Sequence, residues 1–267
     1  MPRAIWSGSI SFGLVNVPVK LFTAVQPKDV RFNQLEAGTN ARIKQKRVSA
    51  QTGEEVSYDN IVKGYEIAPD RYVVITPEEL EALDPKATHS IDIEDFVDLD
   101  QIDPIFFERP YYLVPESGGT KAYALLRDAM RDSGKVGIAR LVLRTKQYLA
   151  AIRPLGDALV LETLLYGDEV VDQDALELPA EGEVEVSDRE LKIARQLIES
   201  LTDDFDPDKY RDEYRERVLE LIERKAEGQE VVLQEAAAEE TAEVVDLMAA
   251  LEASLDAVRK GDKADKA

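Results

Sequence analysis

The residues of this sequence best suited to chemistry are long cations, and the first group lies close together in the chain. Arg42, Lys44, Lys46 and Arg47 fall within the segment Arg42 to Val48. Read as a strand, this segment would place Arg42, Lys44 and Lys46 on one face, with neighbours about 6.6 Å apart. Cations at that spacing can contact successive phosphates of a nucleic acid. The pattern fits a solvated basic hairpin without a partner equally well, so spacing alone leaves both interpretations open.

A second group of cations accompanies two expected strands, Val136 to Leu143 and Gln147 to Pro154, which are joined by a short turn. The group comprises Arg140, Arg144, Lys146 and Arg153. Arg140 and Arg144 share a face by parity, because side chains four apart on a strand point the same way. The hairpin is therefore a second candidate surface for phosphates.

Catalytic and metal chemistry find little support in the sequence. There is no cysteine, so thiolate metal sites are excluded, and a single histidine, His89, gives little support for a serine triad. The carboxylates from Asp92 to Asp103 match no metal-loop spacing. No phosphate-binding Gly-Lys-Ser/Thr loop or nucleophile elbow occurs. We therefore predict a binding protein rather than an enzyme, with no catalytic residue, no metal and no cofactor.

The charge is divided into blocks along the chain. A net charge of −21 would by itself argue against a polyanionic partner. However, residues 1–52 carry +6, residues 53–105 carry −12, residues 106–156 carry +5 and residues 157–267 carry −20. Local cations decide whether phosphates can be bound, so DNA remains a candidate partner. No apolar run approaches the roughly 20 residues that span a bilayer, and we expect a cytoplasmic protein without a membrane partner.

The elements that must position these cations indicate an α+β protein. Strands are expected at 10–21, 72–75, 91–97, 111–114, 136–143, 147–154 and 158–165, and helices at 77–83 and 120–133. Apolar residues occupy even positions from Ile10 to Leu14 and odd positions from Val15, so the inward-facing set of positions changes there. This change of parity predicts a β-bulge or bend that curves a sheet into a barrel. Gly8 and Gly13 fit tight bends there. In the second helix, Ala122, Leu125, Leu126 and Ala129 share a face. Residues 26–60 are too polar to form a core and read as an arm.

Helical patterns begin at about residue 187. Ser187 and Glu190 form a capping box for one helix, and Asp206-Pro207 opens another. A stretch rich in Glu and Ala near 235–243 reads as a linker. After it, Val244, Leu247, Met248, Leu251 and Leu255 recur at spacings of three and four, which predicts an amphipathic helix. Its apolar face either packs back on the body or docks in a partner's groove.

Several segments together resemble the bacterial Ku family. The opening Arg3 to Val19, with the sequence RAIWSGSISFGLVNVPV, is similar to the family's N-terminal signature. Further similarity lies in RIKQKRV (42–48), VKGYE (62–66), FERPYYL (107–113), FDPDKY (205–210) and VDLMAALEAS (245–254). The resemblance covers nearly the whole chain.

The resemblance implies a fold and a function. The fold is a β-barrel core over residues 1–186, with a long strand-connecting arm, or bridge, at about 26–66 that closes a ring in a homodimer. A helical region (187–234) and an acidic linker, docking helix and short charged tail (235–267) follow. The implied function is binding of linear double-stranded DNA ends without sequence specificity in non-homologous end joining. The family protects ends, recruits the ATP-dependent DNA ligase D and is nucleoid-associated.

The resemblance also assigns residues. We expect DNA-binding side chains at Lys20, Lys28, Arg31, Arg42, Lys44, Lys46, Arg47, Lys63, Arg140, Arg144, Lys146 and Arg153. The expected ligase D contacts are Val244, Leu247, Met248, Leu251 and Leu255. The alternative is an acidic protein-interaction scaffold whose basic hairpins pair with acidic faces of another copy or another protein.

Overall fold

A computed structural model describes residues 3–83, 89–143, 146–180, 182–228 and 248–255. The chain divides into two compact units. The first unit comprises Met1–Lys28 and Asn33–Asp172, and the second comprises Asp29–Phe32 and Gln173–Ala267. Each unit is described on its own.

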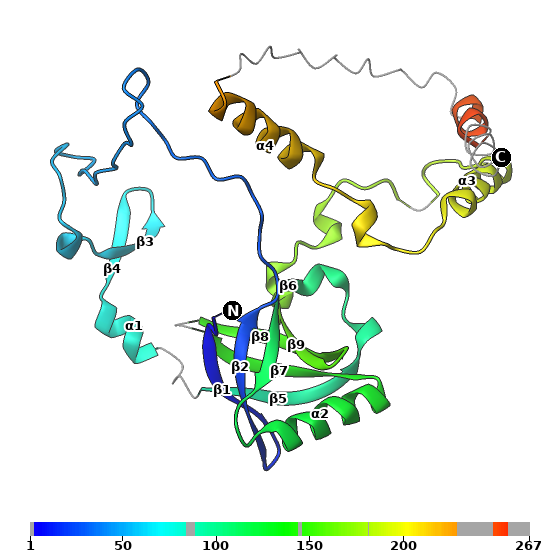
Figure 1. Ribbon diagram of the computed structural model, residues 1–267, viewed down its shortest axis with the longest axis horizontal. Coiled ribbons are helices and arrows are strands. Elements are labelled where there is room, and N and C mark those ends of the chain that lie inside the picture. The colour runs from blue at the N-terminus through cyan, green and yellow to red at the C-terminus, as the bar shows by residue number, and fades with distance from the viewer. Residues whose placement is uncertain (1–2, 84–88, 144–145, 181, 229–247, 256–267) are drawn as a thin grey trace. The chain divides into compact units, whose positions relative to one another are not determined.

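Seven strands of the first unit form a closed barrel (Figure 1). They are β1 (Trp6–Phe12), β2 (Val15–Thr23), β5 (Ser90–Asp98), β6 (Phe107–Pro115), β7 (Lys135–Leu143), β8 (Lys146–Leu155) and β9 (Ala158–Leu164). Around the barrel the order is β1-β2-β6-β9-β8-β7-β5, closed by parallel pairing of β1 with β5. Closure leaves no unpaired sheet edge. The expectation of an α+β protein with a β-barrel is confirmed.

Inward-facing aliphatic side chains fill the barrel. Ile10, Leu21, Ile91, Leu113 and Leu161 are fully buried there. The first four alternate with more exposed residues along their strands, whereas Leu161 follows the buried Val160 in β9. Burial of a side chain of this size stabilises the fold by about 1.5–3 kcal/mol. The interior of the barrel is therefore the hydrophobic core of the protein.

The parity flip at Leu14/Val15 has a different cause from the one predicted. Phe12 pairs with Val15 across a two-residue turn, so β1 and β2 are two strands of a hairpin rather than one bulged strand. Gly13 adopts φ +58, as a tight turn requires. Gly8, in contrast, lies inside β1 and not in a bend. A hairpin with a two-residue turn flips the parity as a bulge does, which is why the pattern was ambiguous.

Helix α2 (Thr120–Ser133) covers one end of the barrel. Its buried side chains are Tyr123, Leu126 and Met130, which join the barrel core. The predicted face was wrong in part, since Leu125 is 65% exposed and Ala129 is also exposed. Spacing alone could not show that Tyr123 is buried in place of Leu125, because burial of the tyrosine depends on hydrogen-bond partners for its hydroxyl inside the core.

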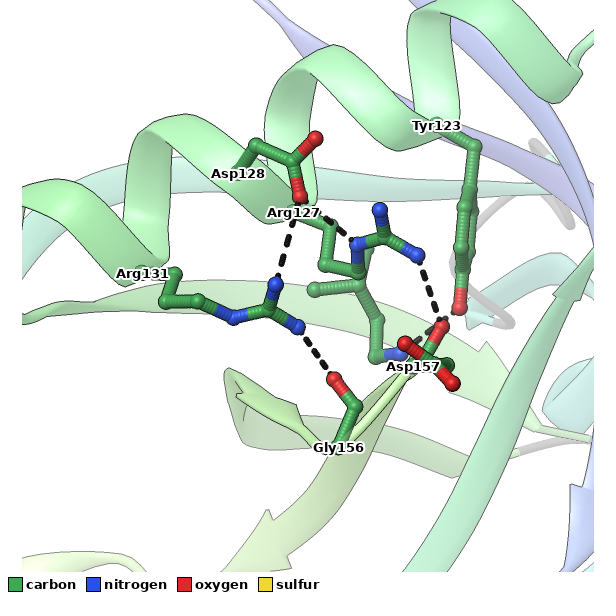
Figure 2. Close-up of polar contacts among 7 residues, drawn as sticks. Tyr123, Arg127, Asp128, Arg131, Gly156 and Asp157 are labelled. Atoms are coloured by element: carbon green, nitrogen blue, oxygen red, sulfur yellow. Dashed lines mark hydrogen bonds and ion pairs between the residues drawn. The ribbon is translucent and has the colours of Figure 1, made fainter.

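Hydrogen bonds fix α2 to the barrel, as Figure 2 shows. The Tyr123 hydroxyl donates to the Leu113 carbonyl (2.7 Å) and accepts from the Leu159 amide (2.6 Å). Burial raises the pKa of Tyr123 above its ordinary value. Arg127 donates to the Asp157 carbonyl (3.0 Å) and Arg131 to the Gly156 carbonyl, both in the β8–β9 turn. The helix is thereby tied to the strands it covers.

The segment between β2 and β5 is a long excursion with little core of its own (Figure 1). It contains the hairpin β3 (Lys63–Ala68) and β4 (Arg71–Ile75), then α1 (Pro77–Leu83). Thr76 and Glu79 form the predicted capping box of α1. Single-turn 3-10 helices occur at η1 (Tyr58–Asn60), η2 (Leu99–Gln101), η3 (Pro104–Phe106), η4 (Gly167–Glu169), η5 (Gln173–Ala175) and η6 (Pro207–Lys209).

The second unit is helical. Helix α3 (Asp188–Leu201) begins at the predicted capping box of Ser187 and Glu190. The helix expected from Asp206-Pro207 forms only the single turn η6, and α4 (Glu213–Ala226) begins after the cap residue Asp212. Residues 248–255 are helical. The expected linker at 235–243 lies outside the described residues.

Candidate nucleic-acid interface

The arm holds its cations on turns rather than on a continuous strand. Arg42 forms an isolated bridge with Leu35, and Val48 forms another with Glu55. The predicted strand over 42–48 is therefore wrong. A strand needs a hydrogen-bonded neighbour, and this segment has one only at its two ends. The predicted Thr52-Gly53 turn is present, with the Gly53 amide donating to the Ser49 carbonyl at φ +71.

Side chains of the arm are exposed and most of its cations are directed to solvent. Lys46 pairs with Glu55 at 2.6 Å, and the Arg47 guanidinium lies 5.2 Å from the centre of the Tyr58 ring. Arg42 donates to the Asn33 amide oxygen. Lys44 has no ion-pair partner among the described residues. The arm therefore offers cations whose redirection to a phosphate would cost little, because exposed pairs contribute only about 0–1 kcal/mol.

Three predicted DNA-binding cations outside residues 42–48 resemble Lys44 in their exposure and in their lack of a partner in the described part of the chain. Lys28, Arg31 and Lys63 are exposed, and no partner for them occurs within the described ranges. Lys28 and Lys63 belong to the first unit, and Arg31 belongs to the second.

The barrel cations are paired with carboxylates. Arg140 lies 3.4 Å from Glu94, and Lys20 lies 3.2 Å from Glu116. Lys146 lies 3.9 Å from Glu169, and its ammonium group stands 5.0 Å from the centre of the Tyr148 ring. All of these side chains keep at least a third of their surface in solvent. Arg144 lies outside the described residues.

Arg153 differs from the other cations of the interface. Its guanidinium donates to both carboxylate oxygens of Glu162, at 3.1 and 2.9 Å. The two side chains are only 25% and 14% exposed. Hydrogen bonding to Glu162 raises the pKa of Arg153. A cation held in this way is poorly placed to contact a phosphate, because it would have to leave a half-buried partner.

Sequence reasoning missed the carboxylates that neutralise these cations. Arg140 and Glu94 lie on neighbouring strands where β5 is bulged, between Ile93 and Asp95. Arg153 and Glu162 lie on the antiparallel pair β8 and β9. Only the cross-strand register could have revealed such pairs, and register follows from pairing partners that the sequence does not state.

The expected ligase-docking face is only partly described. Val244 and Leu247 lie outside the described residues. Met248 and Leu251 are half-buried, and Leu255 is 7% exposed. Glu252 pairs with Arg189 of α3 at 2.9 Å. This part of the helix therefore packs within its own unit.

Neither a metal site nor a membrane-spanning helix occurs in the residues that the structure describes. In the described part of the chain, no group of three potential metal ligands comes together. Among the same residues, no helix has the length and apolar character to cross a membrane. His89 is hydrogen-bonded to the Ser7 carbonyl (3.3 Å) and stacks on Trp6.

These features define a class of protein: a closed β-barrel whose inserted, solvent-exposed arm carries cations suited to phosphate contacts. Residues 11–193 match the family described as the Ku70/Ku80 beta-barrel domain. The chain is 55% identical to "Non-homologous end joining protein Ku" of Anaeromyxobacter sp. (strain K), over 98% of this chain and 88% of that protein. The like-named protein of Bacillus subtilis (strain 168) is 42% identical over 98% of this chain and 84% of its own length.

The chain belongs to the Ku family, as its resemblance implied. A third relative of the same name, from Heliobacterium modesticaldum, is 46% identical over 99% of this chain and 95% of its own length. Among solved structures, the SPOC domain of human PHD-finger protein 3 aligns with 61% of this chain and 95% of its own, with a TM-score of 0.30 and 13% identity.

Proposed function

We propose that this protein binds the ends of linear double-stranded DNA in non-homologous end joining, as the names of its relatives suggest. The observation that carries the proposal is the arm. A segment of more than thirty residues in an acidic chain stays outside the core and exposes its cations to solvent. An extended basic segment of this kind suits a duplex backbone, which presents one negative charge per about 1.7 Å.

Phosphate contacts of this kind carry no sequence information. The arm cations Lys28, Arg42, Lys44, Lys46 and Lys63 therefore support binding without sequence preference and with strong salt dependence. Lys20, Arg140 and Lys146 can join them after exchanging an exposed carboxylate for a phosphate. For Arg153 we propose a structural role in the barrel. Neither assignment requires a catalytic step or a cofactor.

We further propose that the protein acts as a homodimer whose arms close a ring around DNA. The β3–β4 hairpin supports this proposal, because a two-stranded sheet is marginally stable alone. Its apolar side chains Tyr65, Ile67, Tyr72 and Val74 are 67%, 55%, 58% and 55% exposed. An uncovered apolar hairpin suits pairing with a second copy. A ring would bind free ends by threading, shield them from nucleases and exclude closed circles.

The C-terminal region is proposed to recruit the ATP-dependent DNA ligase D. The amphipathic pattern of the helix at 248–255 supports the proposal, which requires Met248, Leu251 and Leu255 to leave their packing within the second unit when the ligase binds. A protein that works on DNA breaks in a bacterium would act at the nucleoid. Protection of ends and recruitment of the ligase are then separable activities of the two units.

Gel shifts with one duplex in linear and covalently closed form test the proposed function. We expect binding to the linear form only, weakened strongly by reversal of Arg42, Lys44 and Lys46 to Glu. A control variant reverses Arg211, Arg215 and Lys225 near or on α4, which changes the net charge equally, and it should bind normally. Equal binding to both forms, or equal losses in both variants, would show that the protein is not an arm-dependent clamp.

A further inference from the structure

The two ends of the barrel are built differently. One end is closed by α2, whose Tyr123, Leu126 and Met130 enter the core. At the other end lies a cavity of about 620 Å³. Its lining comprises Ile5, Trp6, Thr23, Val25, Pro27, Arg109, Pro110, Tyr111, Leu143 and Tyr148. We call this cavity the barrel mouth, and its size is in the range of pockets that hold small organic groups.

Aromatic rings from three strands line the barrel mouth. Trp6 of β1, Tyr111 of β6 and Tyr148 of β8 face inward and pack partly on the core. The indole of Trp6 is held in place by its surroundings. It stacks on His89 with ring centres 6.4 Å apart, and it covers Gly8, where an added Cβ would come within 2.3 Å of the ring. This close approach explains why a glycine occupies the middle of β1.

Two cations flank the barrel mouth, and each is paired with a carboxylate that a phosphate could replace. Arg109 is the charged residue among the described lining residues; its side chain is 70% exposed and lies 3.5 Å from Glu108. Lys146 stands over the Tyr148 ring and adds a second cation beside the cavity. Within the described part of the lining there is no carboxylate. Flat rings together with flanking cations suit a group that is both aromatic and anionic.

The barrel mouth is continuous with the surfaces proposed to bind DNA. Thr23, Val25 and Pro27 are where the chain leaves β2 for the arm, immediately before Lys28. Leu143 and Tyr148 flank the turn of the basic β7–β8 hairpin. A nucleic acid is therefore a better match for the cavity than an acidic peptide, which would explain the cations but not the ring-lined interior.

We propose that the barrel mouth binds an unpaired nucleotide, with its base stacked on the aromatic rings and its phosphate beside Arg109 and Lys146. Base stacking on aromatic side chains tolerates any sequence, because every base has a flat face. This proposal rests on the proposed binding of DNA ends and extends it to ends that carry a single-stranded overhang. Blunt ends would leave the mouth empty.

Trp6 offers a direct readout, because it is the one tryptophan of the sequence. We expect a tetrathymidylate, which is too short to thread a ring, to quench Trp6 fluorescence, whereas an abasic tetramer of equal charge should not. A duplex with a four-nucleotide overhang should bind more tightly than its blunt counterpart. Tyr148→Leu should weaken overhang binding by roughly tenfold and leave blunt-end binding unchanged.

Tyr112→Leu is the matched control, since Tyr112 faces outward from β6 and does not line the mouth. Absence of quenching by tetrathymidylate, or equal quenching by the abasic tetramer, would overturn the proposal. Stronger quenching by an acidic peptide of residues 243–258 would assign the mouth to a protein partner and also overturn it. If linear and closed DNA bind equally while quenching persists, the clamp fails and the nucleotide site stands.

Discussion

Removing Arg153 tests whether the barrel cations divide into structural and DNA-binding residues. In Arg153→Gln, Glu162 keeps its charge at 14% exposure without the two donors that now satisfy it. Breaking a fully buried pair costs about 3–5 kcal/mol, and an exposed pair is worth about 0–1 kcal/mol. With Arg153 at 25% exposure, the expected loss lies between these limits, at about 2 kcal/mol.

Thermal unfolding measures this loss. For a chain of this size, each kcal/mol corresponds to about 2–4 °C, so Arg153→Gln should lower Tm by about 4–8 °C. Glu162→Gln should have a similar effect. The double variant should lose less than the sum of the two, because neither charge is then left unpaired.

Salt titration of DNA binding supplies the second half of the test. Each phosphate contact contributes about 0.9 to the slope of log K against log salt. Arg153→Gln should leave that slope unchanged. Lys44→Gln removes an exposed and unpaired cation from each of the two arms of the proposed dimer, so it should lower the slope by about 1.8. An unchanged Tm together with a reduced slope for Arg153→Gln would refute the structural role and return Arg153 to the DNA interface.

Three further predictions concern the core, α3 and the C-terminus. Tyr123→Phe leaves the buried Leu113 carbonyl and Leu159 amide without their partner, so denaturant unfolding should show a loss of about 1–3 kcal/mol. The Ser187 hydroxyl and amide hold the pKa of Glu190 below its ordinary 4.5. That contribution to α3 is present above pH 4.5 and is lost as pH falls through the lower folded pKa, so the protection factors of the α3 amides against hydrogen exchange should fall there, and Glu190→Gln should abolish this pH dependence. Deletion of residues 239–267 should preserve end binding and abolish stimulation of ligase D, and persisting stimulation would place the docking site elsewhere.

The barrel strands were predictable because apolar and polar residues alternate along most of them. Ile91 and Leu113 alternate with more exposed neighbours on predicted strands and lie in the interior, whereas β9 has three consecutive buried residues at 159–161. The strand expected at 42–48 failed for the opposite reason. Cations alternate along this segment, but it has no apolar face to bury. Without a buried face, no neighbouring strand is held beside it, and only isolated bridges form at its two ends.

The cations of the candidate site can be located in the sequence, but their ion-pair partners cannot. The sequence identifies Lys44 and Arg153 equally well as cations in basic segments. It does not show that one is unpaired and exposed while the other shares a half-buried pair with Glu162. That distinction depends on which strands become neighbours. The barrel mouth depends on this too, because Trp6 of one strand lies more than a hundred residues before Tyr111 and Tyr148 of two others.

Trapping on circular DNA is the most direct test of the central claim that the protein encircles its ligand. The protein is loaded on a linear plasmid, the ends are joined covalently, and the sample is moved to high salt. Phosphate contacts weaken steeply under those conditions, but a threaded ring cannot leave a closed circle. We predict that the protein stays on the circle and is released when the circle is cut once. Dissociation from the circle as fast as from the linear plasmid would contradict the account.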